Sequence, residues 1–286
     1  MLVLEPIVHE TIWGGPRLTP LTTTGETQIG HLYSVYARKE LSNKILNGVH
    51  AGKTLQEVRP DFPLTIALTE ADKDLSLQVH PDDEGAQKLE HLARGKRESW
   101  YFLEAPASGS LVNGCCLKDM EAIRTHVAEN DYEGVLDYLP VTVGDYVFVE
   151  PGTLHAISAG SLVYEIEQGA DFTYRFYDYD RVDAQGNKRE LHTEKALACL
   201  HPELKSVVKQ YQEGSPIVEA TYATQLHHGL NSYENNQDKE VCFTLLKGQG
   251  KADGVELRPG MTVILSPVEK LTELEAQEAM SAWLMI

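Results

Sequence analysis

Short stretches of alternating apolar and polar residues, separated by turns rich in Gly, Pro and Asp, are the feature that most limits how this chain can fold. Strand-like alternation recurs at 75–80, 98–103, 146–149, 161–168 and 173–179, and it restarts after about residue 205 at 239–246, 260–265 and 282–286. Turn signals at 144–145, 151–152 and 183–186 separate these segments. Many short strands with few helices predict a mainly β fold, either a sandwich or a barrel.

Helical periodicity is confined to the first of the two strand-rich blocks. Segment 84–93 follows a possible Asp cap, and segment 119–129 carries apolar residues on one face. Further helical turns are predicted at 133–138 and 193–200. A chain of 286 residues fits two domains. We therefore expect a larger unit at 1–205 that carries the helices, and a small β unit at 206–286.

The large negative net charge of the chain argues against partners that are themselves strongly negative. The formal net charge is −18, from 43 acidic and 25 basic residues. Such a surface repels phosphate backbones and anionic membranes, so we expect neither a nucleic-acid nor a membrane partner. An anionic small molecule would need a local cluster of Lys or Arg against this field.

Cysteine usage and the absence of targeting signals bear on the compartment. The four cysteines include a vicinal pair and no CxxC spacing, which argues against a zinc knuckle or a disulfide framework. No stretch reaches the ~18 apolar residues of a membrane span, and the start of the chain lacks the pattern of a secretory signal. We expect a cytoplasmic protein, and the sequence leaves the oligomeric state open.

Potential metal ligands recur on the strand-like segments. In 75–80, Gln78 and His80 share one strand face, because strand side chains alternate with a period of two. Glu98 begins the next strand, and a Pro-Gly turn at 151–152 aims His155 on the return strand. Taken singly, each is an ordinary polar residue. Together they offer one amide oxygen, one carboxylate and two imidazoles, which suit Zn²⁺, with Fe²⁺ or Mn²⁺ as alternatives, in an open catalytic site.

The same segments resemble those of type I mannose-6-phosphate isomerases, in particular the short bacterial form. The resembling blocks are IWGG (12–15), LSLQVHPDD (75–83), GKRESWYFL (95–103), GDYVFVEPGTLHAI (144–157) and YEIEQGADFTYRFYDYDR (164–181). The resemblance implies a double-stranded β-helix (cupin or jelly-roll) barrel with a smaller C-terminal cupin-like unit. It also implies a zinc-dependent interconversion of mannose 6-phosphate and fructose 6-phosphate through an enediol.

The resemblance extends to single residues. It implies that one zinc ion per chain is held by Gln78, His80, Glu98 and His155. It places Arg175 on an arginine implicated in catalysis or substrate contact, and Lys96 on a pocket lysine. Without it, Arg175 would be a surface ion-pair partner and Lys96 a solvated turn lysine. Glu165 also matches a family position, and we expect it beside the ligands rather than among them.

One segment departs from the family pattern. At 31–36 the chain reads HLYSVY, where the family usually carries a Glu and then a Trp-Glu pair before a serine. This change could alter the fit of the substrate. It motivates two alternatives: a non-catalytic metal-binding cupin that senses sugar or sugar phosphate, and an isomerase of a different sugar phosphate.

Two further possibilities are less favoured. An Fe²⁺ dioxygenase does not need Lys96 and Arg175, whereas an anionic sugar does. The segment 178–187 lacks the spacing of a calcium loop and predicts a hairpin. The sequence does not identify the catalytic base.

Overall fold

The computed structural model describes residues 1–170 and 172–285. Asp171, within the block at 164–181, and Ile286, at the end of the predicted strand 282–286, lie outside the described residues. Within that range, no helix is both long enough and apolar enough to cross a membrane.

Two compact units make up the chain, and neither is a single continuous stretch. Unit 1 comprises Met1–His9, Arg17–Leu68 and Gln210–Ile286, and unit 2 comprises Glu10–Pro16 and Thr69–Lys209. The division at 205/206 expected from the sequence differs from these units, because residues 1–9 and 17–68 cluster with the C-terminal strands. Strand β1 (Leu2–Leu4), for example, pairs antiparallel with β19 (Thr262–Leu265).

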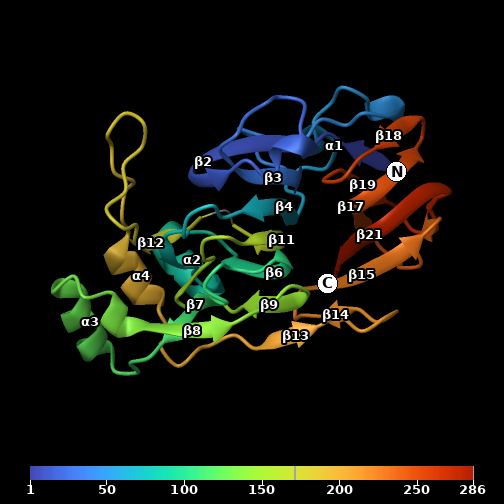
Figure 1. The fold of residues 1–286 in the computed structure, drawn as a ribbon. Helices are drawn as coiled ribbons and strands as arrows, with labels where there is room; N and C mark the ends of the chain where they lie inside the picture. Colours follow the sequence, from blue (N-terminus) through green and yellow to red (C-terminus); the bar gives the residue numbers. More distant parts are fainter. Residues whose placement is uncertain (171, 286) are drawn as a thin grey trace. The chain divides into compact units, whose positions relative to one another are not determined.

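Two antiparallel sheets build unit 2 (Figure 1). The first has the order β12-β5-β10-β7-β8, and the second places β6 between β9 and β11. The strands of the first sheet are β5 (Leu77–Val79), β7 (Ser110–Cys115), β8 (Leu136–Pro140), β10 (His155–Ala156) and β12 (Tyr174–Tyr177). Those of the second are β6 (Lys96–Glu104), β9 (Asp145–Val149) and β11 (Leu162–Gly169).

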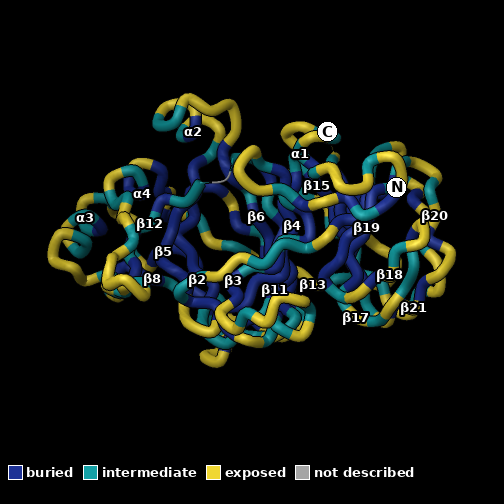
Figure 2. The backbone as a smooth tube through the Cα atoms, turned by 90° about the horizontal axis from the view of Figure 1, so that it is seen from above, coloured by how far each residue is buried: buried dark blue, intermediate teal, exposed yellow. Residues whose placement is uncertain are grey.

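The core of unit 2 lies where the inner faces of these sheets meet. Trp100 of β6 and Val163 of β11 share an apolar cluster with Leu111 of β7, and all three are fully buried. Figure 2 shows β5, β6 and β11 as largely buried strands, whereas helices α2 and α3 expose much of their length. The mainly β, cupin-type architecture predicted from the sequence is confirmed.

Helices α3 (Met120–Ala128) and α4 (Thr193–Cys199) form within the predicted segments, and α2 (Asp83–Glu90) begins one residue before its predicted segment 84–93. The Asp82 side chain accepts a hydrogen bond from the backbone N–H of Gly85, which caps α2 as expected. The predicted helical segment 133–138 is wrong beyond Glu133–Val135. From Leu136 onward the chain forms β8, because pairing with β7 supplies its backbone hydrogen bonds. The sequence analysis also missed the short helix α1 (Leu55–Val58).

Unit 1 is built on a sheet of order β1-β19-β17-β21-β15-β14, with β18 paired to β17. Its other strands are β3 (Ile29–Val35), β14 (Ile217–Val218), β15 (Tyr222–Leu230), β16 (Tyr233–Glu234), β17 (Val241–Ala252), β18 (Val255–Leu257), β20 (Lys270–Leu271) and β21 (Glu273–Leu284). Three more strands span the divisions between units: β2 (Ile7–Gly15), β4 (Leu64–Glu70) and β13 (Val208–Gln210).

Candidate metal centre

Strands β5 and β10 place three of the predicted ligands on one sheet face. His155 on β10 lies directly opposite Gln78 on β5 in antiparallel register. Directly opposite residues in an antiparallel pair point to the same face, and His80 follows Gln78 by two residues. The register therefore brings together two histidines that are far apart in the sequence.

The Pro-Gly turn before β10 explains how His155 is aimed. Gly152 has a φ of +90°, and its N–H donates to the His80 carbonyl oxygen at 2.8 Å. A Cβ atom at this position would lie 2.3 Å from the His201 ring. Glycine is needed here for both its backbone conformation and its lack of a side chain.

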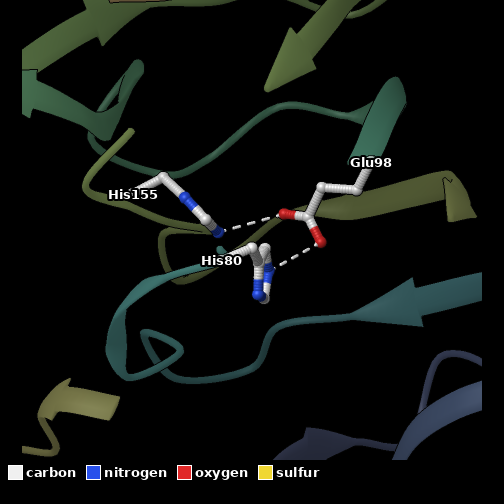
Figure 3. A group of neighbouring side chains, drawn as sticks. All are labelled: His80, Glu98 and His155. Carbon is white, nitrogen blue, oxygen red and sulfur yellow. Dashed lines mark hydrogen bonds and ion pairs between the residues drawn. The ribbon is translucent and has the colours of Figure 1, made fainter. Parts of the chain in front are cut away.

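Strand β6 supplies the carboxylate. His80 Nε2 lies 3.0 Å from Glu98 Oε2, and His155 Nε2 lies 3.1 Å from Glu98 Oε1 (Figure 3). The three side chains are all buried, and each offers a ligand atom within 4.8 Å of the other two. Two sheets thus direct two imidazoles and one carboxylate toward the same point.

Hydrogen bonds behind the imidazoles orient both rings. The Nδ1 atom of His80 lies 3.2 Å from the Phe172 carbonyl oxygen, and the Nδ1 atom of His155 lies 2.8 Å from that of Thr153. A carbonyl oxygen can only accept a hydrogen bond, so each Nδ1 carries the proton. In the neutral rings, each Nε2 then presents a lone pair toward Glu98, as metal-binding histidines do.

The donor set fits a divalent cation. Burial lowers the pKa of His80 to about 4, with the Lys96 and His155 charges acting in the same direction and Glu98 opposing them. Burial by itself would raise the pKa of Glu98, but the neighbouring His80, Lys96 and His155 hold it well below its usual value. Near neutral pH, a carboxylate and a neutral imidazole therefore face each other as two acceptors.

Two of these converging atoms, Glu98 Oε1 and His155 Nε2, have no hydrogen-bond partner among the described residues, although both are buried. Buried acceptors without partners are costly unless a cation satisfies them. His80, Glu98 and His155 thus form a candidate metal-binding triad.

Gln78, the fourth predicted ligand, is buried in the same row as His155. On the other side of β5, Arg175 of β12 is its direct partner. The row across β10, β5 and β12 therefore reads His155, Gln78, Arg175. Arg175 is partly exposed, and its Nε atom is buried with no hydrogen-bond partner among the described residues. Burial, and then the charge of Arg189, lower the pKa of Arg175.

Lys96 lies beside the triad rather than in a solvated turn. Strand β6 extends back to this residue, so Lys96 shares the strand face of Glu98. Its Nζ atom lies 2.8 Å from Glu167 Oε1 and 3.3 Å from Glu98 Oε2, and the side chain is only 7% exposed. The ammonium group is therefore held between two carboxylates.

The sequence analysis missed Glu167 and gave Glu165 little weight. The register of β6 and β11 places Glu167 opposite Glu98, and Glu165 opposite Trp100. Glu165 accepts hydrogen bonds from Trp100 Nε1 at 3.0 Å and from Thr69 Oγ1 at 2.5 Å. Burial raises its pKa, and the nearby charge of Glu98 raises it further. Strand alternation in 164–169 could have placed both glutamates on one face, but not opposite Glu98.

The divergent segment 31–36 lies largely in β3 of unit 1. The ring of Tyr33 stacks on those of His31 and Tyr36, with centroids 5.1 and 4.4 Å apart. Three side chains of the divergent segment therefore form a stack of aromatic rings.

A mainly β protein of cupin type, with a buried His–Glu–His triad for a metal ion, is the class that this fold and this site define. No protein-family model matches the chain. It is 39% identical over 218 residues to the probable mannose-6-phosphate isomerase GmuF of Bacillus subtilis, an alignment that covers 70% of this chain and 68% of that protein. It is 33% identical to the mannose-6-phosphate isomerase ManA of the same organism, over 87% of this chain and 86% of that protein.

The comparison with solved structures identifies the same family as the sequence comparison. The crystal structure of a mannose 6-phosphate isomerase from Bacillus subtilis superposes with a TM-score of 0.84 at 27% identity, covering 99% of both chains. The chain belongs to the mannose-6-phosphate isomerase family and is an enzyme of the isomerase class. The resemblance given by its sequence blocks is confirmed.

Proposed function

We propose that this chain interconverts mannose 6-phosphate and fructose 6-phosphate, with one zinc ion held by Gln78, His80, Glu98 and His155. The observation that carries the proposal is the convergence of two imidazoles and one carboxylate at a buried point, next to Lys96 and in the same row as Arg175. The printed names of the relatives supply the substrate. Two histidines and one glutamate form a three-ligand set that is typical of catalytic zinc sites.

The reaction moves a proton between C1 and C2 of the sugar through an enediol. Zinc bound at this site would supply a Lewis acid that polarises the sugar oxygens. The protein's own groups must bind the substrate, stabilise the negative charge that develops on oxygen, and move the proton.

Arg175 suits the stabilisation of anionic groups. Its guanidinium keeps its charge at any pH at which the protein is folded, and it can donate two parallel hydrogen bonds to a carboxylate-like or phosphate group. It makes no hydrogen bond through its side chain to the described residues, so its donors remain for a ligand. We assign it to the substrate, at either the enediolate oxygen or the phosphate.

Lys96 suits proton transfer or hydrogen-bond donation better than phosphate binding. Its ammonium group already contacts two carboxylates, Glu98 and Glu167, which hold it beside the proposed metal ligands. A proton donor at that place lies close to where the reacting oxygens would bind.

A single preparation of the purified chain tests the proposal. Bound metal is quantified, and conversion of mannose 6-phosphate to fructose 6-phosphate is followed before and after treatment with a chelator and after zinc is restored. Stoichiometric zinc with turnover that is lost on chelation and regained with zinc is the expected result. Metal without turnover of this substrate would instead favour a different sugar phosphate, which the divergent segment 31–36 makes the first alternative.

A further inference from the structure

Lys96 contacts two carboxylates, and the nearer one, Glu167, has no role in the proposed reaction. The Lys96 Nζ atom donates a hydrogen bond to Glu167 Oε1 at 2.8 Å and lies 3.3 Å from Glu98 Oε2. A hydrogen bond between two charged groups at the shorter distance is the stronger of the two contacts. The position of the Lys96 ammonium group therefore depends on Glu167 as well as on Glu98.

The backbone fixes where the Lys96 side chain starts. The Lys96 N–H donates to the Pro81 carbonyl oxygen at 3.1 Å, which holds the start of β6 against the loop that follows β5. Gly169 is the register partner of Lys96 on β11 and has a φ of +109°. A Cβ atom on Gly169 would lie 2.0 Å from the Gly95 carbonyl oxygen, so glycine permits the close approach of the two strands here. Only the flexible side chain of Lys96 remains to be positioned.

The register of β6 and β11 explains how Glu167 reaches Lys96. Glu167 lies directly opposite Glu98, and Lys96 precedes Glu98 by two residues, so all three side chains share one face of the sheet. Lys96 and Glu167 are therefore diagonal neighbours, a separation that long side chains can span. The Glu167 side chain is only 13% exposed, and that of Lys96 is buried more deeply still. Because a buried ion is costly without its partner, removal of Glu167 should force the Lys96 ammonium toward another acceptor.

Glu98 is the acceptor that Lys96 would then turn to. The Lys96 Nζ atom already lies close to Glu98 Oε2, the oxygen that also faces His80 Nε2 at 3.0 Å. Glu165, the third carboxylate of this group, already accepts two hydrogen bonds from other side chains. An ammonium group paired closely with Glu98 would compete with a metal ion for the same carboxylate. Glu167 thus stands between Lys96 and a competing interaction with a proposed metal ligand.

We propose that Glu167 is the positioning residue for Lys96: it holds the ammonium group next to the triad and prevents it from forming a close ion pair with Glu98. Glu98 then stays available to the metal ion, as carboxylate ligands with well-placed neighbours do. Lys96 keeps its place as a donor beside the reacting oxygens. Glu167 acts through Lys96 in this role. The inference rests on the proposed function, since it concerns how Lys96 and Glu98 share that site.

The test compares Glu167→Gln with Glu194→Gln. Glu194→Gln is the matched control, because it removes the same charge from unit 2 at an exposed ion pair with Arg124. The measurements are zinc affinity, by competition with a chelator, and kcat and KM for mannose 6-phosphate. Glu167→Gln should lower both zinc affinity and kcat by about 10- to 100-fold, the range for losing a charge-assisted hydrogen bond. Its KM should stay close to wild type, and Glu194→Gln should change none of these quantities.

Lys96→Met, made alone and together with Glu167→Gln, separates positioning from a merely structural role. If Glu167 acts by holding Lys96 away from Glu98, removing the lysine should restore zinc binding. The double variant should then bind zinc as tightly as wild type or more tightly, while its kcat stays as low as that of Lys96→Met. A general loosening of the site would weaken zinc binding in the double variant as well. That outcome, or equal zinc affinity of Glu167→Gln and wild type, would overturn the proposal.

Zinc binding and turnover together separate this inference from the proposed function. If the wild-type chain binds zinc but fails to isomerise mannose 6-phosphate, the reaction is wrong, and the zinc affinities of the variants still decide the role of Glu167. If wild type isomerises the substrate and Glu167→Gln matches it in zinc affinity and kcat, the reaction stands and the positioning role is refuted.

Glu167→Asp replaces Glu167→Gln if the latter does not fold. It keeps the charge on a shorter side chain, so the Lys96 ammonium should move and kcat should fall, while zinc affinity should change less. A wild-type kcat in Glu167→Asp would then overturn the proposal.

Discussion

Replacing Arg175 by alanine should lower kcat/KM by about 100-fold or more while leaving the metal in place. The size follows from two independent considerations. A charge about 4 Å from a developing anion contributes about 4 kcal/mol at the effective dielectric constant of a partly buried site. The loss of one pre-organised electrostatic donor costs about 2.7–4 kcal/mol in characterised enzymes. Because Arg175 is partly buried and makes no side-chain hydrogen bond to the described residues, no protein partner is left behind without a donor.

The assay measures initial rates in both directions together with zinc content. Arg124→Ala is the matched control. It removes an arginine from unit 2 whose only ion pair among the described residues, with Glu194, is exposed and 3.4 Å long. That variant should behave as wild type, because an exposed pair of this kind contributes little. A wild-type rate in Arg175→Ala with full zinc would refute the assignment of Arg175 to the substrate. Loss of zinc together with activity would place Arg175 in the support of the metal site instead.

Three further outcomes are expected. His155→Ala should remove most of the bound zinc and the turnover, and full activity in that variant would contradict the metal assignment. Thr69→Val should lower the unfolding free energy by about 1–3 kcal/mol in urea denaturation, because buried Glu165 loses a donor. Thr65→Val should cost almost nothing, since the Thr65 hydroxyl is buried without a partner in the described chain; equal effects of the two would refute the reasoning. Burial by itself would raise the pKa of Asp178, but its hydrogen bonds from Arg189 and Arg181 hold the pKa below its usual value. Its stabilising contribution should therefore be present above about pH 4 and be lost as the pH falls below that value. Melting of wild type and Asp178→Asn should therefore converge in acid, and a constant gap would contradict this.

Local pattern determined much of the site. The period of two along 75–80 placed Gln78 and His80 on one face, and the Pro-Gly turn at 151–152 marked where His155 begins its strand. The strand alternation and the turn depend only on residues that are neighbours in the sequence, so both can be predicted from the sequence alone. The four candidate ligands and the mainly β class could be named on this basis, and the family blocks strengthened both.

Which strands pair, and in which register, could not be predicted from local sequence patterns. The sequence could place Glu167 on a strand face, but only the register of β6 and β11 puts it opposite Glu98 and against Lys96. Likewise, a hairpin was predicted at 178–187, but its return arm, which carries Arg189 back to Asp178, became evident only in the structure.

The sequence by itself therefore determined which residues can act as ligands and which strands carry them, because strand alternation and turn chemistry are local. Only the tertiary structure decided which charges meet: the carboxylates around Lys96, the arginines around Asp178, and the grouping of residues 1–9 and 17–68 with the C-terminal strands. The physical reason is that register and sheet order are set by the burial of apolar faces from distant segments. The alternation within one strand shows which of its faces is buried, but not which other strand pairs with it.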